Sequence, residues 1–161
     1  MPRVTKPQAE EAILRRFVSA YEREFGVQLG EPIHGDRPDF EFVDPVTNEK
    51  LGLEVTGVYQ TDDEAKIQYW AVEEWGVFHG SQEDLLTSIN RIIAQKAPKS
   101  ESYGYQGRLM LAIWLGSLVF NEKFDVEFIR PAIVSPPNTF ADIWLITRDR
   151  KDHSDGLYRL Q

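Results

Sequence analysis

The sequence predicts an α/β domain in which a mixed β-sheet is flanked by helices. Three observations support this fold class. A long segment near the N-terminus has helical periodicity, two extended segments follow it across a turn, and apolar runs in the second half have the length of buried strands. A chain of 161 residues is one ordinary domain, which buries about two thirds of its unfolded surface. No repeat or linker divides residues 1–161.

The first expected element is an amphipathic helix over Thr5–Phe25, which Gly26 would end. One apolar face on such a helix is typical of packing against a sheet. That face is predicted from residues at helical spacing, namely Ile13, Leu14, Phe17, Val18, Tyr21 and Phe25.

A β-hairpin is expected next, formed by the extended runs Arg37–Val43 and Leu51–Tyr59. The residues that connect them, 44–49, include Pro45 and Asn48, which are residue types that turns favour. If the middle four of these residues form the loop, the numbers of each opposed pair add up to 93. The register of the hairpin is therefore predicted as well as its existence.

The rest of the chain alternates predicted helices and strands, which indicates a mixed sheet covered on both faces. Two patterns of the capping-box type predict where helices begin. Thr61 with Glu64 opens a helix expected to end at about Trp75, and Ser81 with Asp84 opens another expected to end at about Ala97. Three apolar runs predict strands, namely Leu109–Leu115, Ala141–Thr147 and Leu157–Leu160. The loops are marked by prolines, namely Pro98, Pro131, Pro136 and Pro137.

Composition excludes several classes of protein. The chain has no cysteine, which rules out disulfides, thiolate zinc sites and cysteine nucleophiles and fits a reducing compartment. Residues 1–7 lack the apolar core of a signal peptide, and the longest apolar stretch, 109–120, is too short to span a bilayer. We therefore expect a cytoplasmic protein with no membrane role. Its oligomeric state stays open, and a homodimer is one alternative.

The net charge of −8 is unevenly distributed. Residues 31–84 hold fourteen acidic against three basic side chains, a local charge of −11, so the rest of the chain sums to about +3. An acidic face can be a metal-binding face, because bound cations reverse the local electrostatics. The alternative is a solvated acidic surface.

The predicted register sets Asp39 directly across from Glu54. Opposed residues have Cβ atoms about 4.5–5.5 Å apart, and like charges placed there are destabilising unless a cation lies between them. Mg²⁺ is commonly held by one or two carboxylates together with water and substrate phosphate. Alternation puts Glu41 and Thr56 on the same face. A slip of one residue would separate the pair, and both acids would then line the solvated side of an ordinary hairpin.

Two further charged residues are predicted to point inward. Glu10 falls near the middle of the apolar stripe of the first helix, with Glu11 on its edge as a substitute. Lys96 lies on the apolar face of the helix that follows Ser81. An inward charge is costly unless it is paired or bound to a metal. The alternative for Glu10 is a position in the first turn of the helix, where the helix dipole stabilises a negative charge. The alternative for Lys96 is a side chain that extends to solvent near the end of its helix.

These residues resemble the PD-(D/E)xK phosphodiesterase superfamily, which has the restriction-endonuclease-like fold. The resemblance rests on Arg37-Pro38-Asp39-Phe40, a turn, and Gly52-Leu53-Glu54-Val55-Thr56, with a helix before them and a helix and an apolar strand after them. It spans about residues 8–116 and implies an αβββαβ core. Asp39 matches the first acid of the motif, Glu54 the second, and Glu10 the acid often found on the first helix.

The chain departs from this family at the motif lysine, where it has Thr56. In some members the lysine has migrated to the following helix, and the resemblance implies Lys96 as the replacement, with Lys66 as a weaker choice. Without a replacement the domain would bind but not cut.

The resemblance implies a metal-dependent nuclease that uses Mg²⁺ or Mn²⁺. Asp39 and Glu54 would hold the metal, with the carbonyl of Val55 and with Glu10 completing the ligands. The metal would lower the pKa of a bound water and stabilise charge on the phosphate, and Lys96 would orient the nucleophile. The substrate would be nucleic acid, which includes DNA. Its phosphates would meet the more basic remainder of the chain, namely Arg15, Arg16, Arg91, Lys99, Arg148, Arg150 and Lys151.

Other chemistry has weaker support. The histidines, His34, His79 and His153, have neither a serine-nucleophile elbow nor zincin spacing to act with. His34 and Asp36 with Asp39 are an alternative metal cluster.

A non-catalytic domain is the competing interpretation. It would be an inactive nuclease-like relative, or an acidic interaction domain that binds a basic protein partner or mimics nucleic acid. The acidic segment and Thr56 favour it. Trp70, Trp75 and Phe78 would then form a contact surface, with core packing as their other use.

Overall fold

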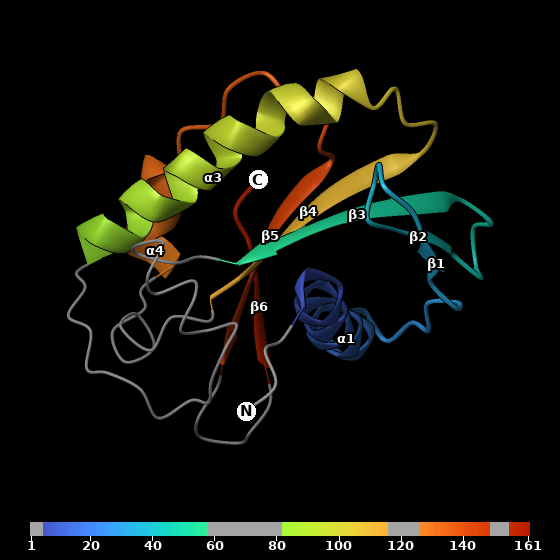
Figure 1. Ribbon diagram of the computed structural model, residues 1–161. Coiled ribbons are helices and arrows are strands. Elements are labelled where there is room, and N and C mark those ends of the chain that lie inside the picture. Colours follow the sequence, from blue (N-terminus) through green and yellow to red (C-terminus); the bar gives the residue numbers. More distant parts are fainter. Residues whose placement is uncertain (1–4, 58–81, 116–125, 149–154) are drawn as a thin grey trace.

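The computed structural model describes residues 5–57, 82–115, 126–148 and 155–161 (Figure 1). These residues form an α/β fold built on a six-stranded mixed sheet whose spatial order is that of the chain, β1 to β6. The strands are β1 (Ile33–His34), β2 (Phe40–Val43), β3 (Lys50–Gly57), β4 (Arg108–Trp114), β5 (Asp142–Arg148) and β6 (Asp155–Arg159). The helices are α1 (Lys6–Phe25), α3 (Gln82–Ser102), the short α4 (Val126–Ile129) and the 3-10 turn η1 (Arg130–Ala132). The predicted α/β class, with a mixed sheet flanked by helices, is therefore confirmed.

The sheet is mixed because its two halves are connected differently. β1, β2 and β3 are antiparallel neighbours, β3, β4 and β5 run parallel, and β6 returns antiparallel to β5. Parallel strands must be buried on both faces. Accordingly β4 and β5 are almost continuously buried and lie inside the sheet, with strands on both sides of each.

Helix α1 begins and ends where its sequence predicts. The Thr5 hydroxyl accepts a hydrogen bond from the Gln8 N–H, and the Gln8 side chain accepts one from the Thr5 N–H at 2.9 Å, which forms a capping box. Gly26 follows the helix with φ 63°, a conformation that favours glycine at this position. The apolar face is also confirmed, because Ile13, Leu14 and Phe17 are buried.

The hairpin has the predicted register. The Asp44 N–H donates to the Glu49 carbonyl at 2.9 Å, and Glu41 pairs with Gly52, so each opposed pair adds up to 93. Asn48 adopts φ 58°, which a turn asparagine tolerates. β3 is described as far as Gly57, so the predicted end of the strand at Tyr59 lies outside the described residues.

Helix α3 is longer than predicted. It runs through Pro98 to Ser102, whereas Ala97 was its expected end. A proline inside a helix removes one hydrogen bond and crowds the preceding turn, but tertiary contacts outweigh that cost here. Ala97 is buried, and the Ser100 hydroxyl accepts a hydrogen bond from the Thr139 N–H at 3.0 Å. The helix predicted from Thr61 to Trp75 lies outside the described residues.

Two helices cover opposite faces of the sheet (Figure 1). On one face the apolar residues of α1 pack on alternate residues of β2 to β5, including Leu53, Met110 and Trp144. On the other face α3 packs on the intervening residues, including Leu111 and Ile143. Since alternation places Glu54 beside Leu111 in the parallel ladder, the acid lies on the face that α3 covers. No helix in the part of the chain that the structure describes is long and apolar enough to cross a membrane.

Candidate active site

Asp39 and Glu54 lie against each other where β2 begins. The Asp39 N–H donates to Glu54 Oε1 at 3.1 Å, and the Val55 N–H donates to Asp39 Oδ2 at 3.0 Å. Each carboxylate is therefore oriented by a hydrogen bond from a backbone N–H, which belongs to the other acid or to the residue after it. The strand geometry explains why these N–H groups are available, since β2 pairs with β3 only as far as Leu53.

Burial makes this pair electrostatically costly. Glu54 is 2% exposed. Burial raises the pKa of its carboxyl, the charge of Asp39 raises it further, and Lys96 lowers it. Burial likewise raises the pKa of Asp39, against the hydrogen bond from Val55 and the charge of Lys96. A cation is the partner that removes this cost, because it favours the ionised form of both groups.

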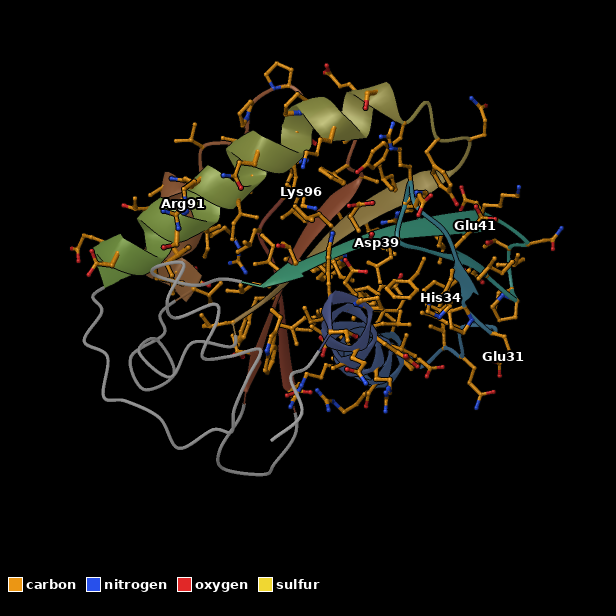
Figure 2. The ribbon with its side chains drawn as sticks, viewed as in Figure 1. Glu31, His34, Asp39, Glu41, Arg91 and Lys96 are labelled. Carbon is orange, nitrogen blue, oxygen red and sulfur yellow. The ribbon has the colours of Figure 1, made fainter. Side chains whose placement is uncertain are left out.

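Lys96 supplies one positive charge to the pair. Its Nζ lies 3.4 Å from Glu54 Oε2, and its side chain is 22% exposed. Figure 2 shows Lys96 on α3 and Asp39 at the start of β2, both in the layer between the helix and the sheet. Because α3 continues for six residues beyond it, Lys96 is not at a frayed helix end. The prediction that its side chain points inward is confirmed.

Glu10 lies near the pair without joining it. Its carboxylate is 3.6 Å from Lys6 Nζ, and burial and the charge of Asp39 raise its pKa. Glu11, the substitute considered from the sequence, is exposed and lies 3.8 Å from Arg15. Glu10 is thus the acid of α1 that is electrostatically coupled to the hairpin pair.

Two tyrosines that sequence reasoning missed complete the surroundings of the acids. Burial and the nearby carboxylate of Glu54 raise the pKa of Tyr103 to about 12. The Tyr105 hydroxyl donates to Glu41 Oε2 at 3.1 Å. Both follow α3 and flank Gly104, so the alternation of tyrosines just before a buried strand was the available signal.

Gly52 is packed tightly beside this site, which gives a testable prediction. A Cβ there would lie 2.8 Å from the Tyr105 ring and 2.9 Å from Pro38. Gly52→Ala is therefore expected to destabilise the fold by about 1–3 kcal/mol through overpacking, measured by chemical denaturation. Gly30→Ala is the matched control, because its Cβ would meet only Val43 O at 3.5 Å. Equal stability of the two variants would contradict the packing described.

Several sequence-based candidates lie elsewhere or are otherwise engaged. Thr56 is half-buried two residues beyond Glu54 on the same strand. His34 packs edge-on against Phe40 and is separated from Lys96 in Figure 2. Arg16 bonds Asp155 at 2.9 Å and lies over the Trp114 ring. Lys66, His79, Arg150, Lys151 and His153, the aromatic residues 70, 75 and 78, and the side chain of Arg148 lie outside the described parts of the chain.

The donor set fits a hard cation held by few protein ligands. Asp39 and Glu54 offer carboxylate oxygens, which suit Mg²⁺ or Mn²⁺. Within residues 5–57, 82–115, 126–148 and 155–161, no three His, Asp or Glu side chains form a group that could hold a metal. Glu10 is therefore not gathered with the pair as a third ligand, and the cluster of His34, Asp36 and Asp39 is not formed.

Comparisons of the chain with protein-family models, with curated proteins and with solved structures find no match. The geometry of the site is therefore the basis for assigning a function.

Proposed function

We propose that the protein is a metal-dependent phosphodiesterase that hydrolyses nucleic acid, with Asp39 and Glu54 holding Mg²⁺ or Mn²⁺. The observation that carries the proposal is the convergence of Asp39, Glu54 and Lys96. Two acids from adjacent strands and a lysine from the next described helix meet in one half-buried place. A structural ion pair needs one acid and one base, whereas this arrangement contains an additional, half-buried carboxylate, that of Asp39.

The order of the described elements supports the same proposal. α1, β1, β2, β3, α3 and β4 follow one another in the chain, with residues 58–81 between β3 and α3. This order is similar to the αβββαβ core of the PD-(D/E)xK superfamily. The short strand β1, which the sequence alone did not indicate, would be the third strand of that core.

Each residue of the candidate site has a separate part in the proposed reaction. When bound, the metal would lower the pKa of a water molecule and offset charge that develops on the phosphate. Asp39 and Glu54 are held in position for it by backbone N–H groups. Lys96 would orient the attacking water, and Tyr103 would fix the Glu54 carboxylate. Arg91 and Lys99, exposed on α3, would contact substrate phosphates.

Calorimetric titration with MnCl₂ tests the metal site. Mn²⁺ is expected to bind the wild type, and its affinity should fall as the pH is lowered from about 8 to about 5, because raised carboxyl pKa values let protons compete with the metal. Without metal, the same raised values favour the protonated folded state. The contribution of the pair to stability should therefore decline as pH rises through its pKa range.

Cleavage of DNA and RNA with Mg²⁺, measured on gels, should accompany binding and should cease in EDTA. Failure to bind Mn²⁺ at any of these pH values would instead favour the inactive, interaction-domain alternative.

A further inference from the structure

A second site lies on the opposite face of the sheet from Asp39 and Glu54. A cavity of about 480 Å³ opens between the C-terminal end of α1, the starts of β4 and β5, and β6. Alternation places Arg108 and Asp142, which line it, on the same face as Met110 and Trp144. That face is covered by α1, so the cavity is separate from the proposed metal site.

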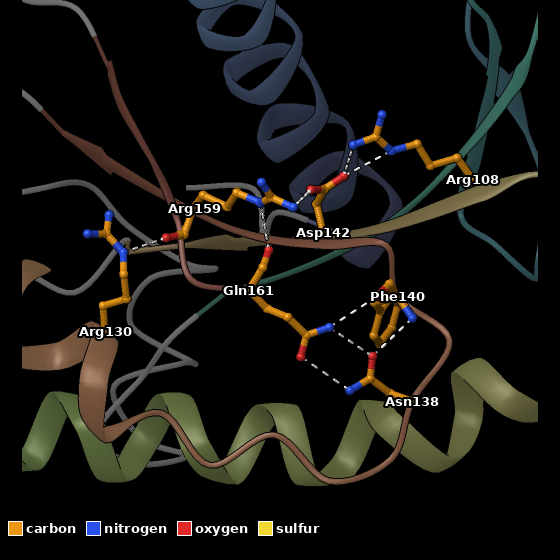
Figure 3. A network of polar contacts seen from close by, with 7 residues as sticks. All are labelled: Arg108, Arg130, Asn138, Phe140, Asp142, Arg159 and Gln161. Carbon is orange, nitrogen blue, oxygen red and sulfur yellow. Dashed lines mark hydrogen bonds and ion pairs between the residues drawn. The ribbon is translucent and has the colours of Figure 1, made fainter.

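Arginines surround one buried acid at this cavity (Figure 3). Asp142 is 1% exposed; Arg108 Nε donates to its Oδ2 at 3.0 Å, and Arg159 Nη2 lies 2.8 Å from its Oδ1. Arg130 Nε donates to the Arg159 carbonyl at 2.9 Å, which brings a third guanidinium to the rim. Among the lining residues, three arginines face two acids, Asp142 and Glu24, which gives a net charge of +1. Arg130 also donates through Nη1 to Glu127 Oε1 at 3.0 Å, an acid that does not line the cavity.

Asp142 fixes the orientation of the Arg108 and Arg159 guanidinium groups, but its single negative charge does not neutralise both of them. Arg108 and Arg159 remain largely exposed although they contact Asp142. Arg108 uses Nε and Nη2 for Asp142, so Nη1 lies outside that pair of bonds. A guanidinium held in a fixed orientation with donors facing solvent suits a phosphate group, since its fork matches two phosphate oxygens.

Aromatic rings form the other wall of the cavity. The Phe25 ring lies 4.6 Å from the Tyr21 ring and 5.8 Å from the Trp144 ring, measured between centroids. Phe25 is 48% exposed, which leaves an apolar ring next to the arginines. The buried Trp144 indole N–H has no hydrogen-bond partner among the described residues, and such a group in a native fold calls for an explanation.

We propose that this cavity binds a nucleotide, with its phosphate on the arginines and its base against the aromatic wall. The volume falls in the range of about 300–1,000 Å³ that is usual for small-molecule sites. An exposed aromatic ring is the surface on which bases stack irrespective of sequence. The same chemistry is offered by a free nucleoside monophosphate and by the phosphorylated 5′ end of a strand.

Titrations in EDTA test this site without the metal site. The probes are adenosine 5′-monophosphate, adenosine, and a short single strand of DNA with and without a 5′ phosphate. Binding is followed by calorimetry and by the Trp144 indole N–H resonance, which Trp144→Phe assigns. Among the probes that bind, we expect the affinity of each phosphorylated one to be at least about tenfold higher than that of its unphosphorylated counterpart. The probe without phosphate lacks the charged hydrogen bonds to the arginines.

Variants of exposed residues localise the binding without disturbing the core. Arg130→Gln and Phe25→Ala are each expected to weaken it about tenfold, whereas Arg37→Gln, at an exposed position that does not line the cavity, should leave it unchanged. Binding of the monophosphate alone, or of the phosphorylated strand alone, would support the proposal and identify the source of the ligand. Phosphorylated probes that bind no better than the others, or unaltered affinity in Arg130→Gln, would overturn it.

Discussion

Replacing Glu54 by glutamine is expected to abolish Mn²⁺ binding and to lower nucleic-acid cleavage by about 1,000-fold. A metal supplies several kcal/mol of stabilisation to the transition state, and each 1.4 kcal/mol corresponds to a factor of ten in rate. Glutamine preserves the size of the side chain and an oxygen that can accept from the Asp39 N–H. What it removes is the charge that would hold the cation.

The fold should survive this substitution, which makes the result interpretable. Burial and the charge of Asp39 already disfavour the ionised form of Glu54, so a neutral amide relieves repulsion as it loses the contact with Lys96. Thermal unfolding in EDTA should therefore resemble that of the wild type. Glu49→Gln, an exposed acid on the same hairpin, is the matched control. Cleavage by Glu54→Gln at the rate of that control would remove the pair from catalysis.

Local chemistry made much of the fold predictable. Thr5, Gln8 and Gly26 define the ends of α1 through contacts within a few residues. The hairpin register follows from a loop closed by Asp44 and Glu49. Because the register was available from the sequence, so was the opposition of Asp39 and Glu54. The inward position of Lys96 followed from helical periodicity in the same way.

The parts that were missed depend on contacts between distant segments. β1 has two exposed residues, Ile33 and His34, and therefore shows no alternation of burial. It exists because it pairs with β2. Helix α3 continues past Pro98 because Ser100 is bonded by Thr139, thirty-nine residues further on. No local pattern contains that bond.

The surroundings of the site were missed for a related reason. Tyr103 lies near Glu54, at the point where the chain turns after α3 and Gly104 adopts φ 56°. Such a conformation favours glycine, but a glycine does not reveal which way the chain turns. The sequence thus identified the charged groups, and the tertiary fold determined which tyrosines orient them.

Lys96→Met is expected to lower cleavage by about 100-fold while the protein stays folded, since a positioned acid–base group contributes about 10²–10⁴. Methionine retains an apolar stem in the half-buried place and loses the charge. Lys50→Met, which replaces an exposed lysine at the start of β3, is the control.

A second measurement separates this role from a structural one. Lys96 lowers the pKa of both Asp39 and Glu54, so its removal should move the pH dependence of Mn²⁺ binding to higher pH. A role confined to packing would not cause that shift, because it involves no charge beside the acids.

The same variant tests whether Lys96 replaces a lysine missing at position 56. Thr56 follows Glu54 by two residues on the same face of β3, so a lysine there would extend over the acids from the sheet instead of from the helix. If one positive charge beside the pair is what the reaction needs, Lys96→Met/Thr56→Lys should recover part of the activity that Lys96→Met loses. Cleavage by Lys96→Met as fast as by Lys50→Met would exclude Lys96 and leave Lys66 as the candidate. Loss without recovery would show that the direction of approach matters as well as the charge.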